Sequence, residues 1–282
     1  MKIKLYFGTV LLFVLLSTQL YSQGIYLNFG SGYSLCAAPK LTQDKNHISN
    51  SDGVYLTDDY KLVKGSGSFG KGIQVNASIG YMFNSNIGAE LGIGYLIGSK
   101  TTDTYKYTYQ STFSEIKSSM SGNMIRLSPA LKITKTFGNI KPYMRTGLVI
   151  GVAPKLTEKH KSEMSTFAYS IIETQTEYTG GIALGFSGSL GADYSITDKI
   201  GIFAEFSVIN QSWAPKKSKY TKYLDNGTDQ LPVMNTSAKE TEYFESFYTD
   251  IQNPDHSSPL KQLKQYYPFS SVGLNFGLHL NL

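Results

Sequence analysis

Residues 87–98 read IGAELGIGYLIG, and this stretch decides the fold. Its odd-numbered positions are apolar throughout, from Ile87 to Ile97, whereas four of its six even-numbered positions are glycine and a fifth is Glu90. Successive side chains of a β-strand point to opposite faces of the sheet. The stretch therefore predicts a strand with one apolar face and one face of small residues and a carboxylate.

The same alternation recurs in seven further segments. It is strict in three of them and weaker in four, and the segments are residues 72–83, 181–194, 272–282, 25–35, 123–134, 142–152 and 200–210. Each is about ten to fourteen residues long, and roughly nine to eleven tilted residues suffice for a strand to cross the hydrocarbon of a bilayer. The pattern predicts eight membrane-crossing strands.

The connections between these segments alternate between short and long. Three are short turns (84–86, 135–141 and 195–199), and four are long and polar (36–71, 99–122, 153–180 and 211–271). Short periplasmic turns and long extracellular loops are typical of outer-membrane barrels. We predict an all-β fold: an eight-stranded antiparallel transmembrane β-barrel, an up-and-down meander with both termini at the short-turn end. Ten strands would result if part of the last loop entered the membrane.

The polar faces distinguish this barrel from a secreted soluble sandwich. A water-facing surface is about a quarter to a third charged, but these faces consist mainly of glycine, serine, alanine and asparagine. Their charges are three acids and three bases, namely Glu90, Asp193, Glu205, Arg126, Lys132 and Arg145. Because an unpaired buried charge is costly, we expect these six residues to form a balanced charge network of ion pairs inside the lumen.

The first 22 residues predict a cleaved signal peptide. Lys2 and Lys4 precede the mostly apolar stretch 5–16, and small polar residues follow. The apolar stretch is shorter than the roughly 20 residues that a spanning helix needs. We therefore expect a signal peptide over residues 1–22 and a single barrel domain over residues 23–282.

The chain resembles the small outer-membrane β-barrels of Gram-negative bacteria, the OmpA/OmpX/OmpW-like group and the PorT-like barrels of the Bacteroidetes. The resemblance covers the mature chain, and it is most specific at the C-terminus. There, Asn275, Gly277, Leu280 and Leu282 are similar to the terminal signal that the barrel-assembly machinery reads, although the family usually has an aromatic residue at the last position. The resemblance implies an outer-membrane location, contact with membrane lipids and lipopolysaccharide, and insertion by that machinery.

The sequence indicates the architecture of the protein more directly than its function. The interior of an eight-stranded barrel is just wide enough for its own side chains, which argues against a general porin. We expect a structural or surface-interaction role for a monomer whose long loops meet an extracellular ligand or protein, with a narrow small-solute channel as the alternative. A lipid-modifying or proteolytic enzyme is the second alternative, for which His256, between Asp255 and Ser257, is the nearest candidate. No Gly-x-Ser-x-Gly motif supports catalysis, so we expect no enzyme.

Composition excludes several other classes of partner. The four histidines and the single cysteine are scattered without metal-ligand spacing, so we expect neither metal nor cofactor. The formal charge is only +5, which is too small and dispersed for nucleic acid. In the longest loop we expect Trp213 and Tyr220 to join an aromatic girdle at the membrane interface, and the loops to pack as a cap with strand extensions over 105–109 and 220–224. We expect the lysines of this loop to lie on a solvated surface, with contact to lipopolysaccharide phosphates as the alternative; they are Lys216, Lys217, Lys219 and Lys222.

Overall fold

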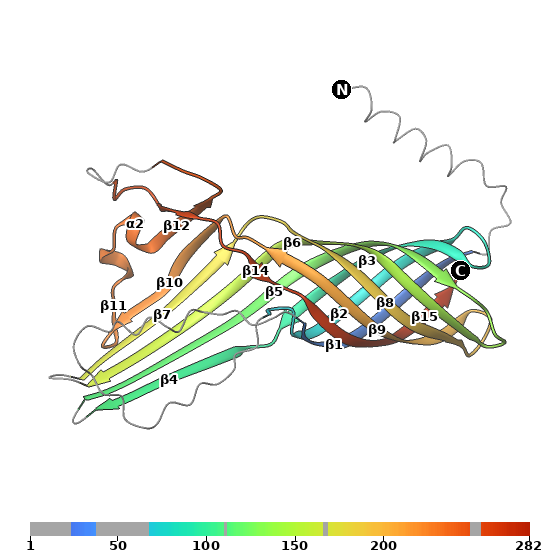
Figure 1. Cartoon of the computed structure of the whole chain (residues 1–282), viewed down its shortest axis with the longest axis horizontal. Helices are drawn as coiled ribbons and strands as arrows, with labels where there is room; N and C mark the ends of the chain where they lie inside the picture. The colour runs from blue at the N-terminus through green and yellow to red at the C-terminus, as the bar shows by residue number, and fades with distance from the viewer. Residues whose placement is uncertain (1–23, 38–67, 110–111, 166–168, 249–254) are drawn as a thin grey trace.

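Eight strands form a closed ring in the computed structural model, which describes residues 24–37, 68–109, 112–165, 169–248 and 255–282. They are β1 (Ile25–Cys36), β2 (Gly72–Met82), β3 (Ile87–Gly98), β5 (Thr112–Thr134), β6 (Ile140–Ser165), β8 (Ala183–Ser195), β9 (Ile200–Trp213) and β15 (Ser271–Asn281). Neighbouring strands in the ring are antiparallel, and the pairing of β1 with β15 joins the two ends of the chain (Figure 1). The predicted eight-stranded barrel is confirmed.

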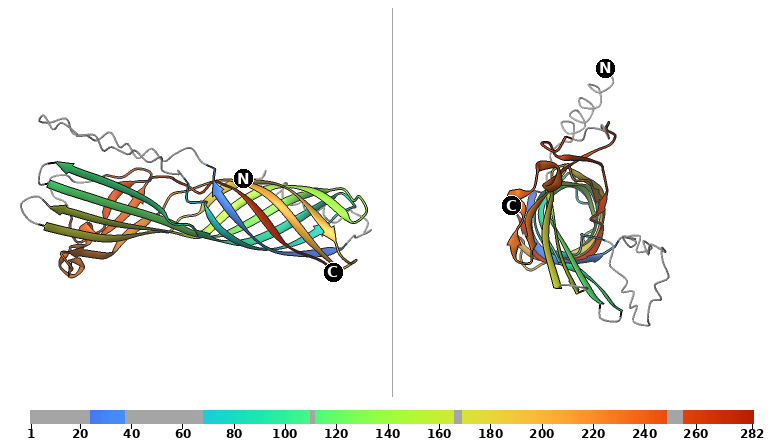
Figure 2. Two further views of the ribbon diagram at one scale, coloured as in Figure 1. Left: turned by 90° about the horizontal axis from the view of Figure 1, so that it is seen from below. Right: turned by 90° about the vertical axis from the view of Figure 1, so that its left-hand side faces the viewer.

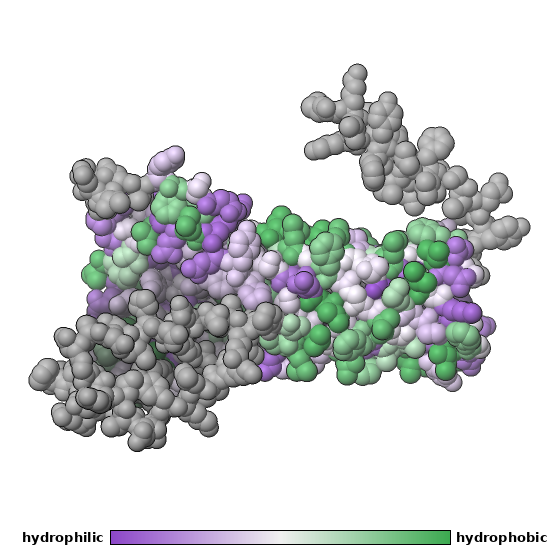
Figure 3. All heavy atoms as spheres, viewed as in Figure 1, coloured by the Kyte–Doolittle hydropathy of each residue, from purple (hydrophilic) through white to green (hydrophobic). Residues whose placement is uncertain are grey.

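Alternation along each strand separates an apolar exterior from a polar interior. In β3, for example, Leu91 is 55% exposed whereas the adjacent Glu90 is 5% exposed. Apolar side chains cover much of the barrel in Figure 3. Burial of this kind is the reverse of that in a soluble barrel, because here the apolar side chains face outward.

The short connections and both ends of the described chain lie at one end of the barrel (Figure 1). Leu282 N donates to Ile25 O over 3.0 Å there. The β2–β3 turn is closed by Asn84, whose Oδ1 accepts 2.8 Å hydrogen bonds from the backbone N–H groups of Asn86 and Ile87. Such side-chain capping is the reason that asparagine favours tight turns.

At the opposite end, strands continue well beyond the barrel. β5 has 23 residues and β6 has 26, about twice the lengths that their apolar patterns predicted. Together with five shorter strands they form a sheet in the order β13-β12-β10-β7-β6-β5-β4, which we call the distal sheet (Figure 2). The shorter strands are β4 (Thr101–Tyr109), β7 (Tyr169–Thr179), β10 (Lys217–Asp225), β12 (Glu240–Phe244) and β13 (Leu260–Leu263).

The prediction that residues 99–122 and 153–180 are loops was therefore wrong, whereas the strand extensions expected over 105–109 and 220–224 lie within β4 and β10. Polar residues occupy both faces of these segments, so no apolar stripe marks them as strands. Four small elements complete the connections: β11 (Thr228–Asp229), the 3₁₀ helix η1 (Leu231–Val233), α2 (Thr236–Lys239) and β14 (Tyr267–Pro268). Among the described residues, no helix is long and apolar enough to span a membrane.

The barrel changes into the distal sheet at a local irregularity. β6 pairs with β8 as far as Gly151 and with β7 from Lys155 onward. Between these two residues, Ala153 has a positive φ of 48°, and the register of β5 against β6 shifts between Asn123 and Ile125. A bulge adds twist and bends a strand, which lets one strand serve both the curved wall and the distal sheet.

Candidate functional site

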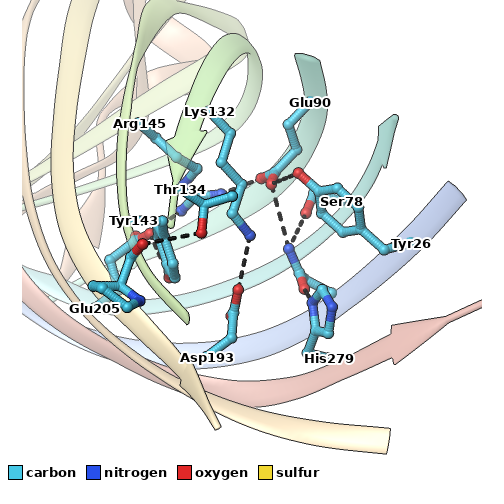
Figure 4. A network of polar contacts seen from close by, with 12 residues as sticks. Tyr26, Ser78, Glu90, Lys132, Thr134, Tyr143, Arg145, Asp193, Glu205 and His279 are labelled. Atoms are coloured by element: carbon cyan, nitrogen blue, oxygen red, sulfur yellow. Dashed lines mark hydrogen bonds and ion pairs between the residues drawn. The ribbon is translucent and has the colours of Figure 1, made fainter. Parts of the chain in front are cut away.

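A layer of ionic side chains crosses the lumen near the short-turn end (Figure 4). Lys132 Nζ on β5 lies 2.9 Å from Asp193 Oδ2 on β8, and both side chains are at most 5% exposed. The ammonium also lies 4.6 Å from the ring centroid of Tyr26 and 4.3 Å from that of Tyr143. Two aromatic faces therefore add cation–π stabilisation to a desolvated ion pair.

Arg145 on β6 joins two carboxylates. It forms ion pairs with Glu90 of β3 and Glu205 of β9. Each carboxylate also accepts from a tyrosine: Tyr26 Oη donates to Glu90 over 2.9 Å, and Tyr143 Oη donates to Glu205 over 3.1 Å. The sequence pattern did not single out these tyrosines, although the strand parity that identified the charges also places both side chains inside.

Amides and a histidine complete the polar layer. Asn28 Nδ2 donates to Ser78 Oγ over 3.2 Å and to Glu90 over 3.3 Å. Its Oδ1 lies 2.7 Å from His279 Nδ1, which links β1 to β15. Asn275 Nδ2 donates to Ser207 Oγ over 3.1 Å. This hydrogen bonding satisfies groups that would otherwise be buried without partners.

Arg126 behaves differently from the other five charged residues. Its Nε donates to Gln211 Oε1 over 3.0 Å, and its Nη2 donates to Phe269 O over 3.1 Å. No carboxylate of the described residues pairs with it, so the expectation of an ion pair for Arg126 was wrong. The reason is its position on β5. Glu90 lies opposite Ala130, and Arg126 is four residues away from Ala130, which is about 13 Å along the backbone of the strand.

An apolar plug closes the lumen beyond Arg126. It consists of the buried residues Phe69, Leu96, Met124, Leu156, Ala183, Trp213 and Phe269. Trp213 is fully buried, and its Nε1 donates to Gly180 O over 2.8 Å. The expectation that Trp213 belongs to an interfacial girdle was therefore wrong. Its odd position in β9 is the signal that could have shown this, because Glu205 and Gln211 share that parity and point inward.

Between the ionic layer and the plug lies a polar cavity of about 100 Å³. Arg126, Arg145 and Glu90 line it together with a band of small residues that includes Ser78, Gly92, Ser128, Ser187 and Ser189. A cavity of this volume holds several water molecules. The lumen therefore contains a small cavity with the ionic layer on one side and the plug on the other.

Sequence comparison places this architecture in a family. The family model described as the outer membrane protein beta-barrel domain matches residues 29–229, which is more than half of the chain. The chain belongs to this family. As an outer-membrane barrel it lies in the outer membrane of the cell, with its short turns on the periplasmic side and its distal sheet outside.

Solved outer-membrane proteins are similar to this barrel at low sequence identity. Neisserial surface protein A is 12% identical, with a TM-score of 0.36 over 93% of this chain and 100% of that chain. Ail of Yersinia pestis, solved with the heparin analogue sucrose octasulfate, is 9% identical, with a TM-score of 0.29 over 91% and 97% of the two chains. CarO2 of Acinetobacter baumannii is 10% identical, with a TM-score of 0.31 over 91% and 99%. No curated protein matches the sequence.

The residues predicted as an assembly signal all lie in or next to β15, the strand that closes the outer-membrane barrel. Asn275 is buried in the lumen. Gly277 packs closely against β1, because a Cβ added at this position would lie only 2.1 Å from Phe29 O. Leu280 is half-buried and pairs with Leu27, whereas Leu282 is 74% exposed. A role for these residues in assembly stays a prediction.

The distal sheet has two chemically different faces. On one face Lys155 Nζ lies 2.9 Å from Glu177, and two further cross-strand ion pairs follow, Lys219–Glu240 at 2.8 Å and Lys222–Glu173 at 2.5 Å. The other face begins at the plug with three tyrosines: the Tyr178 ring lies 6.5 Å from Tyr243 and 5.7 Å from Tyr267. Burial raises the pKa of Tyr267 to about 12 and also raises the pKa of Tyr178 and Tyr243.

His256 lies in the connection beyond β12. Its Nδ1 is 3.2 Å from Ser237 Oγ, whereas the neighbouring Asp255 accepts a 2.6 Å hydrogen bond from Ser257 Oγ. All of these contacts are exposed to solvent. Within the described ranges, the carboxylate next to His256 is thus used to hold a turn.

Proposed function

We propose that this outer-membrane barrel acts as a non-enzymatic surface-interaction protein whose interaction surface is the distal sheet. One observation carries the proposal: β5 and β6 run without interruption from the membrane into the distal sheet. Their pairing continues from Thr134↔Tyr143 to Phe113↔Ser165. A sheet that is continuous with a barrel wall is held rigidly, and a rigid surface binds a partner at a lower entropic cost than a flexible loop does.

The closed lumen supports this proposal over a channel. A solute would have to pass both the Arg145–Glu90–Glu205 layer and the plug around Trp213. The first barrier is held by charge-assisted hydrogen bonds and the second by packing of apolar side chains. Neither can open without breaking buried contacts that the eight-stranded barrel needs for stability.

The surroundings of His256 support a non-enzymatic role. A general base needs a group that orients it and must lie within hydrogen-bond reach of the proton that it takes. Here Asp255 is engaged by Ser257, and the histidine is exposed. The neighbouring carboxylate therefore does not orient this histidine, whose Nδ1 contacts Ser237 instead.

Lipopolysaccharide is the lipid partner that we propose for the base of the distal sheet. Lys216 and Lys217 are exposed directly after β9 leaves the barrel, and no ion pair of the described residues uses them. Lysine binds phosphate as a point charge. Lys219 and Lys222, by contrast, are held by glutamates. The barrel-assembly machinery remains the partner that we propose for the C-terminal strand during insertion.

Site-specific photo-crosslinking in living cells tests the proposal. A photoreactive amino acid is placed at Lys159 or Gln175 in the distal sheet and, as a matched control, at the lipid-facing Leu91 of β3. We expect a discrete crosslinked protein or polysaccharide from the sheet positions and only lipid adducts from Leu91. Absence of any adduct from the sheet positions, together with steady conductance of the purified protein in a planar bilayer, would reverse the assignment in favour of the channel.

A further inference from the structure

The face of the distal sheet that carries the cross-strand ion pairs changes in character along β12 and β13. On this face β12 presents Glu240, Glu242 and then Phe244, and β13 presents Lys261 and then Leu263. Phe244 and Leu263 are paired in the register, so their side chains lie next to each other. Both strands therefore change from charged to apolar residues toward the same end.

The apolar end of these two strands is the end nearest the membrane. β10 starts at Lys217, soon after β9 ends at Trp213, and runs away from the barrel (Figure 1). β12 is antiparallel to β10, and β13 is parallel to β12, so both run back toward the barrel. Tyr243 N, next to Phe244, donates to Lys216 O over 2.9 Å. The end of β12 therefore lies beside the point where the chain leaves the barrel rim.

Further exposed apolar side chains gather at this rim. β14 pairs with β9 there, and Tyr267 packs against the plug, whereas the preceding Tyr266 is 63% exposed. Leu263 is 59% exposed, and the Phe244 ring lies 6.4 Å from the ring of Phe247. These side chains form a surface that we call the apolar foot, and its members are Phe244, Phe247, Leu263 and Tyr266.

The apolar foot continues the lipid-facing surface of the barrel. Leu184 is exposed on the outside of β8 and lies opposite Ser212 of β9, which also lies opposite Pro268. Tyr266 is only two residues from Pro268, which is about 7 Å of extended chain. An exposed apolar patch marks an interaction site, and aromatic side chains beside a hydrocarbon surface are typical of the membrane interface.

We propose that the apolar foot lies against the outer leaflet of the membrane that holds the barrel, with its side chains among the lipopolysaccharide headgroups. Lysines complement the phosphates of that leaflet: Lys216 and Lys217 are exposed next to β12, and Lys261 is exposed two residues before Leu263. The inference rests on the lipopolysaccharide contact proposed above for Lys216 and Lys217, to which it adds an apolar contact. Such a contact holds the β12–β13 edge of the distal sheet at the membrane surface.

Quenching of a fluorophore by spin-labelled lipid tests the proposal. In a Cys36→Ser background, a cysteine at Leu263 carries the fluorophore, and the protein is refolded into vesicles of phosphatidylcholine and lipopolysaccharide that contain a lipid spin-labelled near its headgroup. A cysteine at Thr228 is the matched control, because nine residues of β10, about 30 Å of strand, separate it from the barrel end of the sheet. We expect quenching at Leu263 and none at Thr228. Absence of quenching at Leu263 would overturn the proposal.

Two double variants separate the apolar foot from the lysines. Phe244→Ser with Tyr266→Ser should abolish the quenching at Leu263, and the different migration of boiled and unboiled protein on a gel confirms that the barrel has folded. Quenching that persists in Lys216→Gln with Lys217→Gln would support the foot even where the lysines do not bind lipopolysaccharide. Quenching that is lost in the lysine variant and retained in the Phe244 and Tyr266 variant would overturn the foot and leave the lysines as the whole contact.

Discussion

Lys132 Nζ and Asp193 Oδ2 lie 2.9 Å apart inside the barrel, joining β5 to β8 across the intervening β6. Neither side chain reaches solvent, and the rings of Tyr26 and Tyr143 flank the ammonium. This pair links strands that are not neighbours in the sheet. It therefore resists flattening of the barrel cross-section, which backbone hydrogen bonds between neighbours alone do not prevent.

Lys132→Met should destabilise the barrel because it leaves Asp193 buried without a countercharge. Removing one partner of a buried pair costs about 3–5 kcal/mol. Lys132→Met combined with Asp193→Leu should recover most of that loss, since no charge then remains. Urea unfolding of the refolded protein in lipid vesicles measures all three proteins, and a double variant no more stable than Lys132→Met would show that the pair is not coupled.

Trp213→Ala should destabilise the barrel through the plug. The side chain is fully buried and contacts Phe269 edge-on at a centroid distance of 6.0 Å. Truncating a large buried aromatic residue costs about 3–5 kcal/mol. Trp213→Phe serves as the matched control, because it keeps most of the packing and loses only the hydrogen bond to Gly180 O. A small loss of stability in Trp213→Ala would contradict a packed plug, because truncation there leaves a cavity.

Ala153 occupies a backbone conformation that favours glycine. Its φ of 48° costs a residue with a Cβ roughly 1–2 kcal/mol. Ala153→Gly should therefore stabilise the protein by up to about 1 kcal/mol, whereas Ala153→Val should destabilise it, because a β-branched side chain is least compatible with positive φ. The midpoint of urea unfolding separates the two, and stabilisation by valine would disprove the strain at this junction.

The turn at Asp255 should be sensitive to acid. Hydrogen bonds from the side chain of Ser257 and, to a smaller extent, from that of Ser258 lower the pKa of the exposed Asp255 carboxyl to about 2. Because the folded-state pKa lies below the ordinary value of 3.8, the turn is stabilised at neutral pH and loses that stabilisation as the pH falls through about 2. The Ser257 amide NMR signal should titrate near that pH. In Ser257→Ala the midpoint should rise toward the ordinary value, and an unchanged midpoint would assign the shift to another group.

Cysteine labelling checks the orientation of the barrel in cells. In a Cys36→Ser background, a cysteine at Thr228, which is exposed near the end of β10, should react with an impermeant maleimide in intact cells. A cysteine at Ser85, which is exposed in the β2–β3 turn, should react only after the outer membrane is permeabilised. The opposite pattern would invert the topology.

The sequence by itself determined the membrane barrel. In β3, the apolar odd positions and the small or charged even positions dictate which face meets lipid, because the two-residue period of a strand allows no other assignment. The same parity placed Glu90, Lys132 and Arg145 inside before any contact was known. The terminal Asn275 and Gly277 likewise follow from the alternation of β15.

Only the tertiary structure decided which inward side chains meet. Register and strand tilt bring Arg145 between Glu90 and Glu205, whereas Arg126, which is also an inward-pointing arginine, lies further along β5 against Gln211. The distal sheet was also beyond the sequence pattern, because both of its faces carry polar residues such as Glu158 and Lys159. A hydrophobic period appears in a sequence where one face of a strand is buried against lipid or a core. Strands that are held mainly by hydrogen bonds to their neighbours need no such face, and their sequences lack the period.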